Sequence, residues 1–263
     1  HPDAVLLRSA KLHDWDVPDA LKAVGRAGAG VNNVPVEAMS ARGIPVFNAP
    51  GANANAVKEL VLAGMFLAAR NVCAAWAFAE SLEGDDAAMN KAAEAGKKQF
   101  TGFELPGRTL GVIGLGAIGV NIANAAAALG MKVVGYDPKI TVRSAWNLES
   151  NVTRAQTVDE VMSASDMVTL HVPEIDETRG MINGARLAAA RDGQVLLNFA
   201  RAGVVDDEAV VKALDSGRLG SYVCDFPAVA LKGHDRVVAL PHIGASTNEA
   251  QENCAIMAAD EIR

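Results

Sequence analysis

Apolar runs that alternate with helix-like stretches set the pattern of the first third of this chain. Short apolar runs occupy residues 4–7, 20–24 and 45–47, and a helix is expected over residues 35–43, before the last of them. Residues 53–71 follow as a longer helix with a broad apolar face. Such alternation is typical of parallel strands covered by helices, so we expect a small α/β domain here.

The same alternation returns in the second part of the chain. Between the two parts, residues 80–99 are polar, Ala-rich and interrupted by glycine, and we interpret them as a linker or arm. Expected strands lie at residues 110–113, 131–136, 167–172, 194–199, 221–224 and 236–240, with helices up to about 129 and near 157–164, 184–191 and 206–216. Ser246 and Glu249 are expected to cap a final helix. At least six strands with right-handed crossovers predict a doubly wound parallel sheet.

The most specific motif joins the first two strands of this second part. Residues 114–119 read GLGAIG, a G-x-G-x-x-G pattern, and the next strand ends on Asp137. Gly114 permits a tight turn, Gly116 lets the backbone approach a pyrophosphate, and Gly119 lets helix and strand pack closely. The helix N-terminus offers free N–H groups to phosphate. The alternative is a glycine-rich structural turn, but the strand–turn–helix–strand context favours dinucleotide binding.

The cofactor preference depends on Asp137. A carboxylate at the end of the second strand can bond both hydroxyls of an adenine ribose, and it would repel a 2′-phosphate. We therefore expect NAD to be preferred over NADP.

Composition limits the possible partners. The chain has 263 residues, 50% of them hydrophobic, and a net charge of −7, which argues against nucleic acid or an anionic membrane as a partner. Three cysteines show no metal-ligand spacing, and we interpret them as buried thiols in a reducing, cytoplasmic setting without a metal site. The uncharged stretch at residues 109–131 contains the GLGAIG turn, and no signal peptide is visible. Because the chain starts directly in a strand, we expect it to be trimmed at both ends.

Three polar residues follow strand ends, where ligands of such sheets bind. Arg201 can hold a substrate carboxylate, His242 can exchange a proton near neutral pH, and Asp225 ends the strand between them. Taken singly, Arg201 is more often a surface salt bridge and His242 a structural residue flanking a helix. Their joint position around a nicotinamide site favours catalysis.

These motifs together resemble the D-isomer-specific 2-hydroxyacid dehydrogenases over nearly the whole chain. The matching segments are GLGAIG at 114–119, YDP at 136–138, HVP at 171–173, NFARAG at 198–203 and PHIGAST at 241–247. The resemblance implies a Rossmann cofactor domain and a smaller flavodoxin-like substrate domain. Residues 1–72 would form the substrate domain without its first strand and helix, 73–245 the NAD-binding domain with a linker or dimer arm at 73–104, and 246–263 a helix returning to the substrate domain.

A narrower resemblance concerns the substrate. LRS at 7–9, GRAGAGVNN at 25–33, NAPGANANAV at 48–57 and YVCDFP at 222–227 look like the phosphoglycerate dehydrogenase branch. This implies oxidation of 3-phospho-D-glycerate to 3-phosphohydroxypyruvate, a step of serine synthesis, by a homodimer or dimer-based oligomer. A hydroxypyruvate- or glyoxylate-type reductase and an NAD-binding regulatory protein stay open as alternatives.

The resemblance also assigns roles to residues. Arg201 would bind the substrate carboxylate, His242 would act as acid and base, and Asp225 would orient the nicotinamide carboxamide. The implied cofactor-binding residues are Gly114, Gly116, Ala117, Ile118, Gly119, Asp137, Pro138, His171, Val172, Pro173, Thr178, Phe199, Ala200, Asp225 and Gly244. The implied substrate-binding residues are Arg8, Arg26, Ala27, Gly28, Ala29 and Gly30.

One feature departs from the family. Relatives use a Glu after the Asp-bearing strand to orient the catalytic His, whereas residues 226–236 contain no Glu and Asp235 as their only carboxylate. The third catalytic role is therefore unfilled or filled from elsewhere, and Asp235 is a competing candidate for it.

Overall fold

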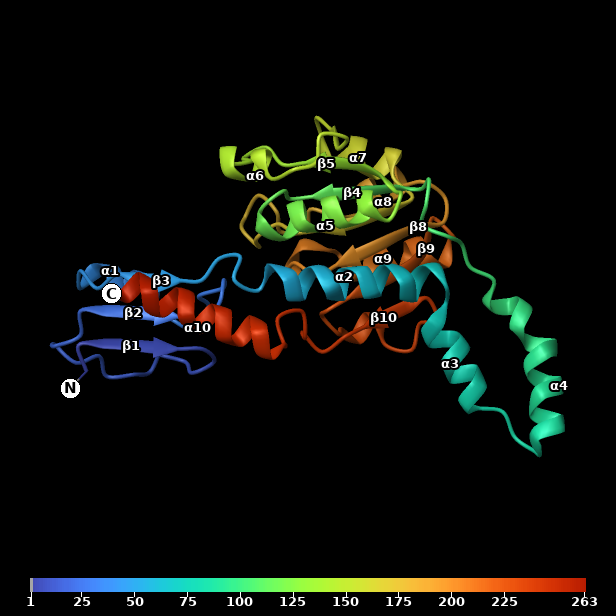
Figure 1. The fold of residues 1–263 in the computed structure, drawn as a ribbon, viewed down its shortest axis with the longest axis horizontal. Helices are drawn as coiled ribbons and strands as arrows, with labels where there is room; N and C mark the ends of the chain where they lie inside the picture. Colours follow the sequence, from blue (N-terminus) through green and yellow to red (C-terminus); the bar gives the residue numbers. More distant parts are fainter. Residues whose placement is uncertain (1) are drawn as a thin grey trace. The chain divides into compact units, whose positions relative to one another are not determined.

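A computed structural model describes residues 2–263 of the chain (Figure 1). Contacts divide these residues into two compact units. The larger unit is Lys58–Ile243, and the smaller unit combines the described residues up to Val57 with Gly244–Arg263. The division falls within helix α2 (Ala54–Ala69), which continues across it.

The larger unit is built on a seven-stranded sheet of order β10-β9-β8-β7-β4-β5-β6, in which every pairing is parallel. Its strands are β4 (Thr109–Ile113), β5 (Lys132–Tyr136), β6 (Thr153–Arg154), β7 (Met167–Leu170), β8 (Gln194–Asn198), β9 (Leu219–Cys224) and β10 (Val237–Ala239). The strand order reverses between β4 and β7, which is the switch point where ligands of such sheets bind. The predicted doubly wound sheet is confirmed. β6 was not expected, since its two residues are exposed and carry no apolar signal.

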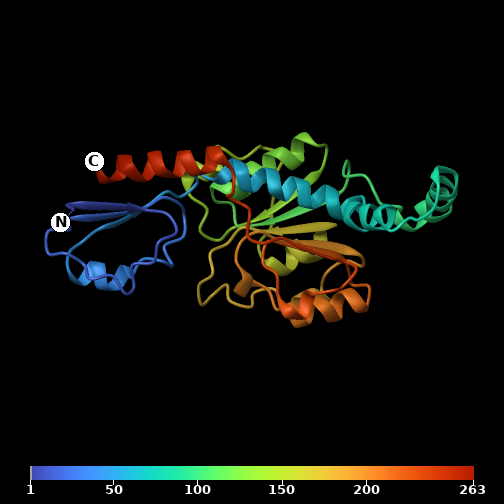
Figure 2. The same ribbon diagram turned by 90° about the horizontal axis from the view of Figure 1, so that it is seen from below.

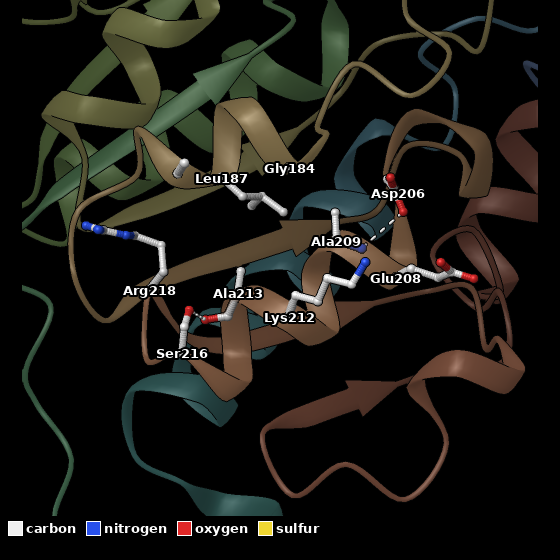
Figure 3. Close-up of a pocket in the computed structure, with 10 residues that line it drawn as sticks. Gly184, Leu187, Asp206, Glu208, Ala209, Lys212, Ala213, Ser216 and Arg218 are labelled. Atoms are coloured by element: carbon white, nitrogen blue, oxygen red, sulfur yellow. Dashed lines mark hydrogen bonds between the residues drawn. The ribbon is translucent and has the colours of Figure 1, made fainter.

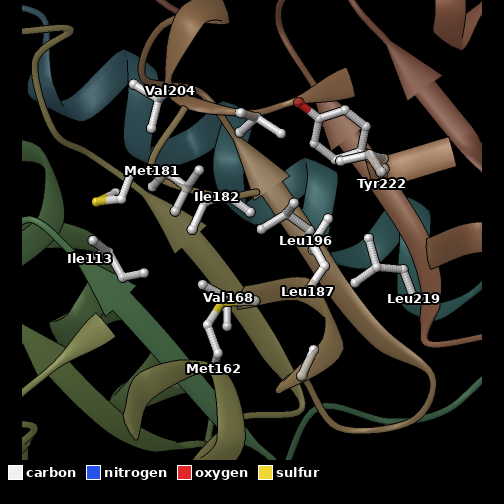
Figure 4. Close-up of a cluster of buried hydrophobic side chains, with 14 of the residues drawn as sticks. Ile113, Met162, Val168, Met181, Ile182, Leu187, Leu196, Val204, Leu219 and Tyr222 are labelled. Carbon is white, nitrogen blue, oxygen red and sulfur yellow. The ribbon is translucent and has the colours of Figure 1, made fainter. Parts of the chain in front are cut away.

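Helices cover both faces of this sheet. α7 (Val158–Ala164), α8 (Gly184–Ala188) and α9 (Asp207–Asp215) contribute to one core with β4 and β7–β9 (Figure 4). Leu196 points into that core, while its neighbour Leu197 faces Gly64 of α2 on the other side. α5 (Ala117–Ala128) packs on β4 and β5. Burial on both faces explains the nearly continuous apolar sequences of β7 and β8.

Most expected helices of the larger unit lie where the sequence placed them. Thr157 caps α7, because its Oγ1 accepts the Glu160 N–H at 3.1 Å. The remaining short elements are α6 (Val142–Trp146), η2 (Ala202–Val204) and η3 (Val229–Leu231).

An arm formed by α3 (Val72–Glu80), α4 (Asp86–Gly96) and η1 (Lys97–Phe100) projects from the larger unit in both views (Figures 1 and 2). The linker or arm expected at 80–99 is largely helical, since its alanines favour a helix and Asp85 caps it. Neither α3 nor α4 has a buried residue, and Cys73, expected to be buried, is partly exposed. Among the described residues no single helix is long and apolar enough to cross a membrane; only α2 and α3 together, bent by 65°, reach that length and composition.

The smaller unit contains a parallel sheet of order β1-β2-β3, from β1 (Ala4–Leu7), β2 (Ala23–Arg26) and β3 (Val46–Asn48). α1 (Val36–Ala41) contributes Met39 to a cluster around Val24, and α10 (Asn248–Ile262) contributes Cys254 and Ala258 to a second cluster. The cap predicted at Ser246 is wrong by one residue. Thr247 caps α10 instead, accepting the Ala250 N–H at 3.1 Å.

Candidate active site

The glycine-rich turn between β4 and α5 forms the base of the candidate dinucleotide site. Gly114 has φ 94°, and a Cβ there would lie 2.4 Å from the His171 carbonyl oxygen. A Cβ on Gly119 would lie 1.9 Å from the Gly114 oxygen, so helix and turn need both glycines. A Cβ on Gly116 would instead enter open space, and no side chain caps α5. The free amides at this helix start therefore face a cradle suited to pyrophosphate.

Asp137 lies at the carboxyl end of β5, beside this turn. Its Oδ2 accepts the Leu115 N–H and its Oδ1 accepts the Lys139 N–H, each at 2.8 Å. These bonds fix the carboxylate, and each oxygen keeps a second lone pair with which to receive a ribose hydroxyl. The carboxylate that is expected to favour NAD over NADP is thus held in place by backbone amides.

His171 continues β7 toward the same turn. Its backbone N–H donates to the Ile113 oxygen at 2.7 Å, and its Nε2 lies 2.8 Å from Thr169 Oγ1. Burial of the ring lowers the pKa of His171 to about 3, so the imidazole is neutral at physiological pH. Nδ1 is buried and has no hydrogen-bond partner among residues 2–263. A neutral His in this position forms part of the wall of the cradle and is not a proton donor.

The loop after His171 is shaped by Thr178. Its hydroxyl accepts the Ile175 N–H at 2.9 Å and donates to the Pro173 oxygen at 2.5 Å. In the structure Thr178 therefore holds the loop that carries Pro173.

Arg201 lies in a turn after β8 that is fixed from beneath by Asn198. The fully buried Asn198 accepts the Ala200 N–H at 3.1 Å and donates to the Arg201 oxygen at 3.0 Å. Arg201 Nη1 donates to the Ala200 oxygen at 2.6 Å. Within residues 2–263 Arg201 forms no ion pair, which argues against the surface salt-bridge interpretation. Its remaining donors suit a substrate carboxylate.

His242 follows β10 in a constrained backbone conformation. It has φ 57°, uncommon for a residue other than glycine, and Asp225 Oδ1 accepts the N–H of the next residue, Ile243, at 2.8 Å. The exposed imidazole stands 5.0 Å from the Phe226 ring, centroid to centroid, with 59° between the planes. No described carboxylate bonds to it; Asp235, the expected candidate, is exposed and makes no such contact.

The candidate substrate residues of the smaller unit surround the ends of β1 and β2. Arg8 Nη2 donates to the Ala245 oxygen at 3.4 Å, while its buried Nη1 has no hydrogen-bond partner among the described residues. A Cβ on Gly28, whose φ is 150°, would lie 1.5 Å from Arg26 Nη1, so the 26–30 loop closes directly over the Arg26 side chain. Arg8 and Arg26 both oppose the rise that burial causes in the pKa of the Cys254 thiol. The two guanidinium groups therefore both lie near the Cys254 thiol.

The comparison with known families decides the identity of this arrangement. Residues 65–244 match the model of the D-isomer specific 2-hydroxyacid dehydrogenase, NAD binding domain. The chain belongs to this family, and its cofactor is NAD.

Curated relatives of this chain include D-3-phosphoglycerate dehydrogenases. Those of Methanocaldococcus jannaschii and Bacillus subtilis are each 36% identical over 99% of this chain and 49% of their own length. The chain thus spans about half the length of the curated relatives it matches.

Solved structures of other family members share its fold. Apo D-mandelate dehydrogenase of Rhodotorula graminis has a TM-score of 0.84 at 27% identity, over 98% of this chain and 79% of its own. NAD+-bound 3-phosphoglycerate dehydrogenase of Entamoeba histolytica has a TM-score of 0.75 at 28% identity, over 99% and 78%. The predicted family, Rossmann fold and cofactor are confirmed.

The structure also reveals residues that the sequence did not single out. Asn198 and Phe226 support Arg201 and His242, and both stand in the quoted NFARAG and YVCDFP segments. Asn53 has a buried Oδ1 without a partner among residues 2–263. Asn53 follows the Gly51-Ala52 loop before α2. A polar residue beside such a loop is the one feature of the sequence that could have marked it as a site residue.

A groove of about 530 Å³ lies elsewhere on the larger unit, between α8 and α9 (Figure 3). Leu187 and Ala213 give it an apolar wall, and Asp206, Lys212 and Arg218 line its edge. None of the candidate site residues lines this groove, so the groove is separate from the candidate site. Among residues 2–263 no group of three or more His, Cys, Asp or Glu is placed to hold a metal ion.

Proposed function

We propose that this protein oxidises a D-2-hydroxy acid with NAD+, and that its substrate is 3-phospho-D-glycerate, which becomes 3-phosphohydroxypyruvate in serine synthesis. The observation that supports a phosphorylated substrate is the pair Arg8 and Arg26 in a protein of net charge −7. A buried guanidinium nitrogen without a partner, as in Arg8, suits an anion that supplies the missing acceptor. The names of the curated relatives support the same substrate.

The roles of the residues follow from their surroundings. When bound beside the glycine-rich turn and Asp137, NAD+ would supply the acceptor for the hydride from C2 of the substrate. Arg201 holds the carboxylate with the donors that its turn leaves free, and His242 takes the proton of the C2 hydroxyl. Asp225 fixes the backbone after His242 and orients the nicotinamide carboxamide. Ala27–Gly30 contribute backbone amides to the substrate, with Arg8 and Arg26 at its phosphate.

The domain roles are part of this proposal. Residues 1–72 act as the substrate domain, 73–245 as the cofactor domain, and 246–263 as the helix that returns to the substrate domain. The arm at 73–104 joins two copies into a dimer, a role supported by the exposed side chains of α3 and α4.

Two other functions each have an observation in their favour. A reductase that needs no phosphate is favoured by structural neighbours such as a glyoxylate reductase of 28% identity. An NAD-binding regulatory protein of weak activity is favoured by the absence of a described carboxylate bonded to His242.

The test is NADH production from 3-phospho-D-glycerate beside a panel of unphosphorylated D-2-hydroxy acids, with NAD+ binding measured by calorimetry. We expect phosphoglycerate to have the highest kcat/KM. A higher kcat/KM for an unphosphorylated acid would favour the reductase, and binding of NAD+ without turnover of any acid would favour the regulator.

A further inference from the structure

The loop after β7 and the turn that carries Arg201 are joined by one carboxylate. Glu174 Oε1 pairs with Arg179 Nη1 at 2.8 Å, within the same loop. Glu174 Oε2 accepts the Gly203 N–H at 3.3 Å. Gly203 lies two residues after Arg201, so Glu174 bonds to the same turn as Asn198, which donates to the Arg201 oxygen.

The contact with Gly203 is close and is supported by a second bond. The Gly203 oxygen accepts the Gly180 N–H at 2.7 Å, so both backbone groups of Gly203 bond to the 174–180 loop. A Cβ on Gly203 would lie 2.4 Å from Glu174 Oε1. Only glycine lets the carboxylate come this near the backbone.

The ion pair with Arg179 sets the charge near Arg201. Without Arg179, Glu174 would present a negative charge beside the turn that has to bind an anionic substrate. With it, the pair is neutral, and both oxygens of the carboxylate are engaged. The arrangement therefore supplies a hydrogen-bond acceptor for Gly203 at little electrostatic cost to an anion.

We propose that Glu174 is a positioning residue for Arg201, holding its turn through Gly203 while Arg179 neutralises the carboxylate. The inference rests on the proposed function, because it assigns Arg201 to the substrate carboxylate. The Glu174 side chain is partly exposed, and exposed ion pairs add little to the free energy of unfolding. The effect of its loss should therefore appear in the turn and in substrate binding before it appears in folding.

The first measurement reads the turn without turnover. We compare wild type, Glu174→Ala and the control Glu177→Ala, an exposed residue of the same loop, by hydrogen–deuterium exchange over residues 199–205. We expect the Gly203 amide to exchange faster in Glu174→Ala alone. Unchanged exchange there, with Tm intact, would overturn the inference.

The second measurement separates positioning from general destabilisation. In Glu174→Ala we expect KM for the hydroxy acid to rise about 10-fold, with the Kd for NAD+ within about 2-fold of wild type. Glu174→Gln keeps an acceptor for Gly203 and should recover part of the loss. Equal losses for acid and NAD+, or no recovery, would point to a purely structural role and overturn the inference.

The third measurement tests the charge. Arg179→Met leaves Glu174 unpaired, so KM for the acid should rise and the rise should shrink as salt increases. Adding Glu174→Gln to Arg179→Met removes the charge and should lower KM again; a KM that stays high would overturn the neutralising role. A wild type that oxidises no hydroxy acid would remove the proposed function, while the exchange experiment would still report on the Glu174 contact itself.

Discussion

At the scale of single residues, burial away from water sets the protonation state of a side chain in the candidate site. His171 shows this most clearly, because burial of its ring lowers its pKa to about 3. An unfolded chain would release that ring to water and restore an ordinary pKa of about 6.5. The difference ties the stability of the fold to pH.

We expect stability to fall on acidification because of His171. Between about pH 6.5 and 3 the unfolded state binds the proton and the folded state does not, so this contribution is complete above pH 6.5 and is lost below it. The loss approaches about 1.4 kcal/mol per pH unit in that range. Urea unfolding at pH 7.5 and 5.5 should show a smaller difference in His171→Gln than in wild type. Equal differences would contradict the assignment.

Asp137 should control the choice of cofactor. Removing its carboxylate in Asp137→Ala loses the ribose acceptor and the bonds to Leu115 and Lys139, so NAD binding should weaken and the gap to NADP should narrow. Asp137→Asn keeps an acceptor without the charge and should narrow the gap with less loss for NAD. The measurement is kcat/KM with both cofactors. Equal use of NAD and NADP by the wild type would refute this interpretation.

Arg8 should act on the phosphate of the substrate. A charge-assisted bond to phosphate contributes about 1.5–3 kcal/mol, so Arg8→Ala should raise KM for phosphoglycerate about 10-fold or more. An unphosphorylated analogue should be nearly unaffected. Arg42→Ala, in the same unit but bonded to Val17 and Asp19, is the matched control. Equal losses on both substrates would remove the phosphate assignment.

At the scale of elements, the segment around η3 decides how His242 works. The segment brings Phe226 to the His242 ring but supplies no bonded carboxylate among the described residues. Oxidation needs a neutral imidazole and tolerates this arrangement. Reduction needs a protonated one, which a neighbouring carboxylate would stabilise.

We therefore expect reduction of the keto acid to decline at lower pH than in relatives that carry the Glu. Val229→Glu should move this decline upward, and the substitution should fold normally because Val229 is 95% exposed. Ala230→Glu is the second position for the same test. The measurement is the pH profile of reduction for wild type, both variants and Asp235→Asn. A wild-type profile equal to that of the relatives and unmoved by Asp235→Asn would show that another carboxylate serves His242.

At the scale of the whole molecule, the arm is distinctive because neither of its α-helices, α3 and α4, has a buried residue. Trp76 is 66% exposed and Val72 43%, on a helix with no buried residue. These two exposed apolar side chains on a projecting helix are suited to burial against a second copy of the chain.

We expect Trp76→Glu to weaken dimer formation, because it would bury an unpaired charge in the interface. Light scattering after size-exclusion chromatography measures the mass. Ile140→Glu is a matched control, since Ile140 is an exposed apolar residue of the larger unit outside the arm. A wild-type mass of one chain, or equal masses for wild type and Trp76→Glu, would contradict the proposed dimer.

Much of the fold could be predicted, because its signals are local. Parallel strands buried on both faces leave apolar runs such as Met167–Leu170, and GLGAIG fixes a turn by spacing alone. Local signals also explain the errors. Ser246 precedes Glu249 by three residues and so matches the capping-box pattern, but the structure caps the helix with Thr247, which accepts the Ala250 N–H. β6 has two exposed residues and no pattern, and it exists because β5 offers its edge.

The sequence by itself determined the alternation of strands and helices, the glycine turn, and Asp137 at the end of β5, because each is set by residues near one another in the chain. Only the tertiary structure decided which polar groups lose water and what they bond. Glu174 against Gly203, Arg8 against Ala245 and the buried ring of His171 each depend on segments distant in sequence. Burial and hydrogen bonding are sums over such contacts, and no local pattern contains them.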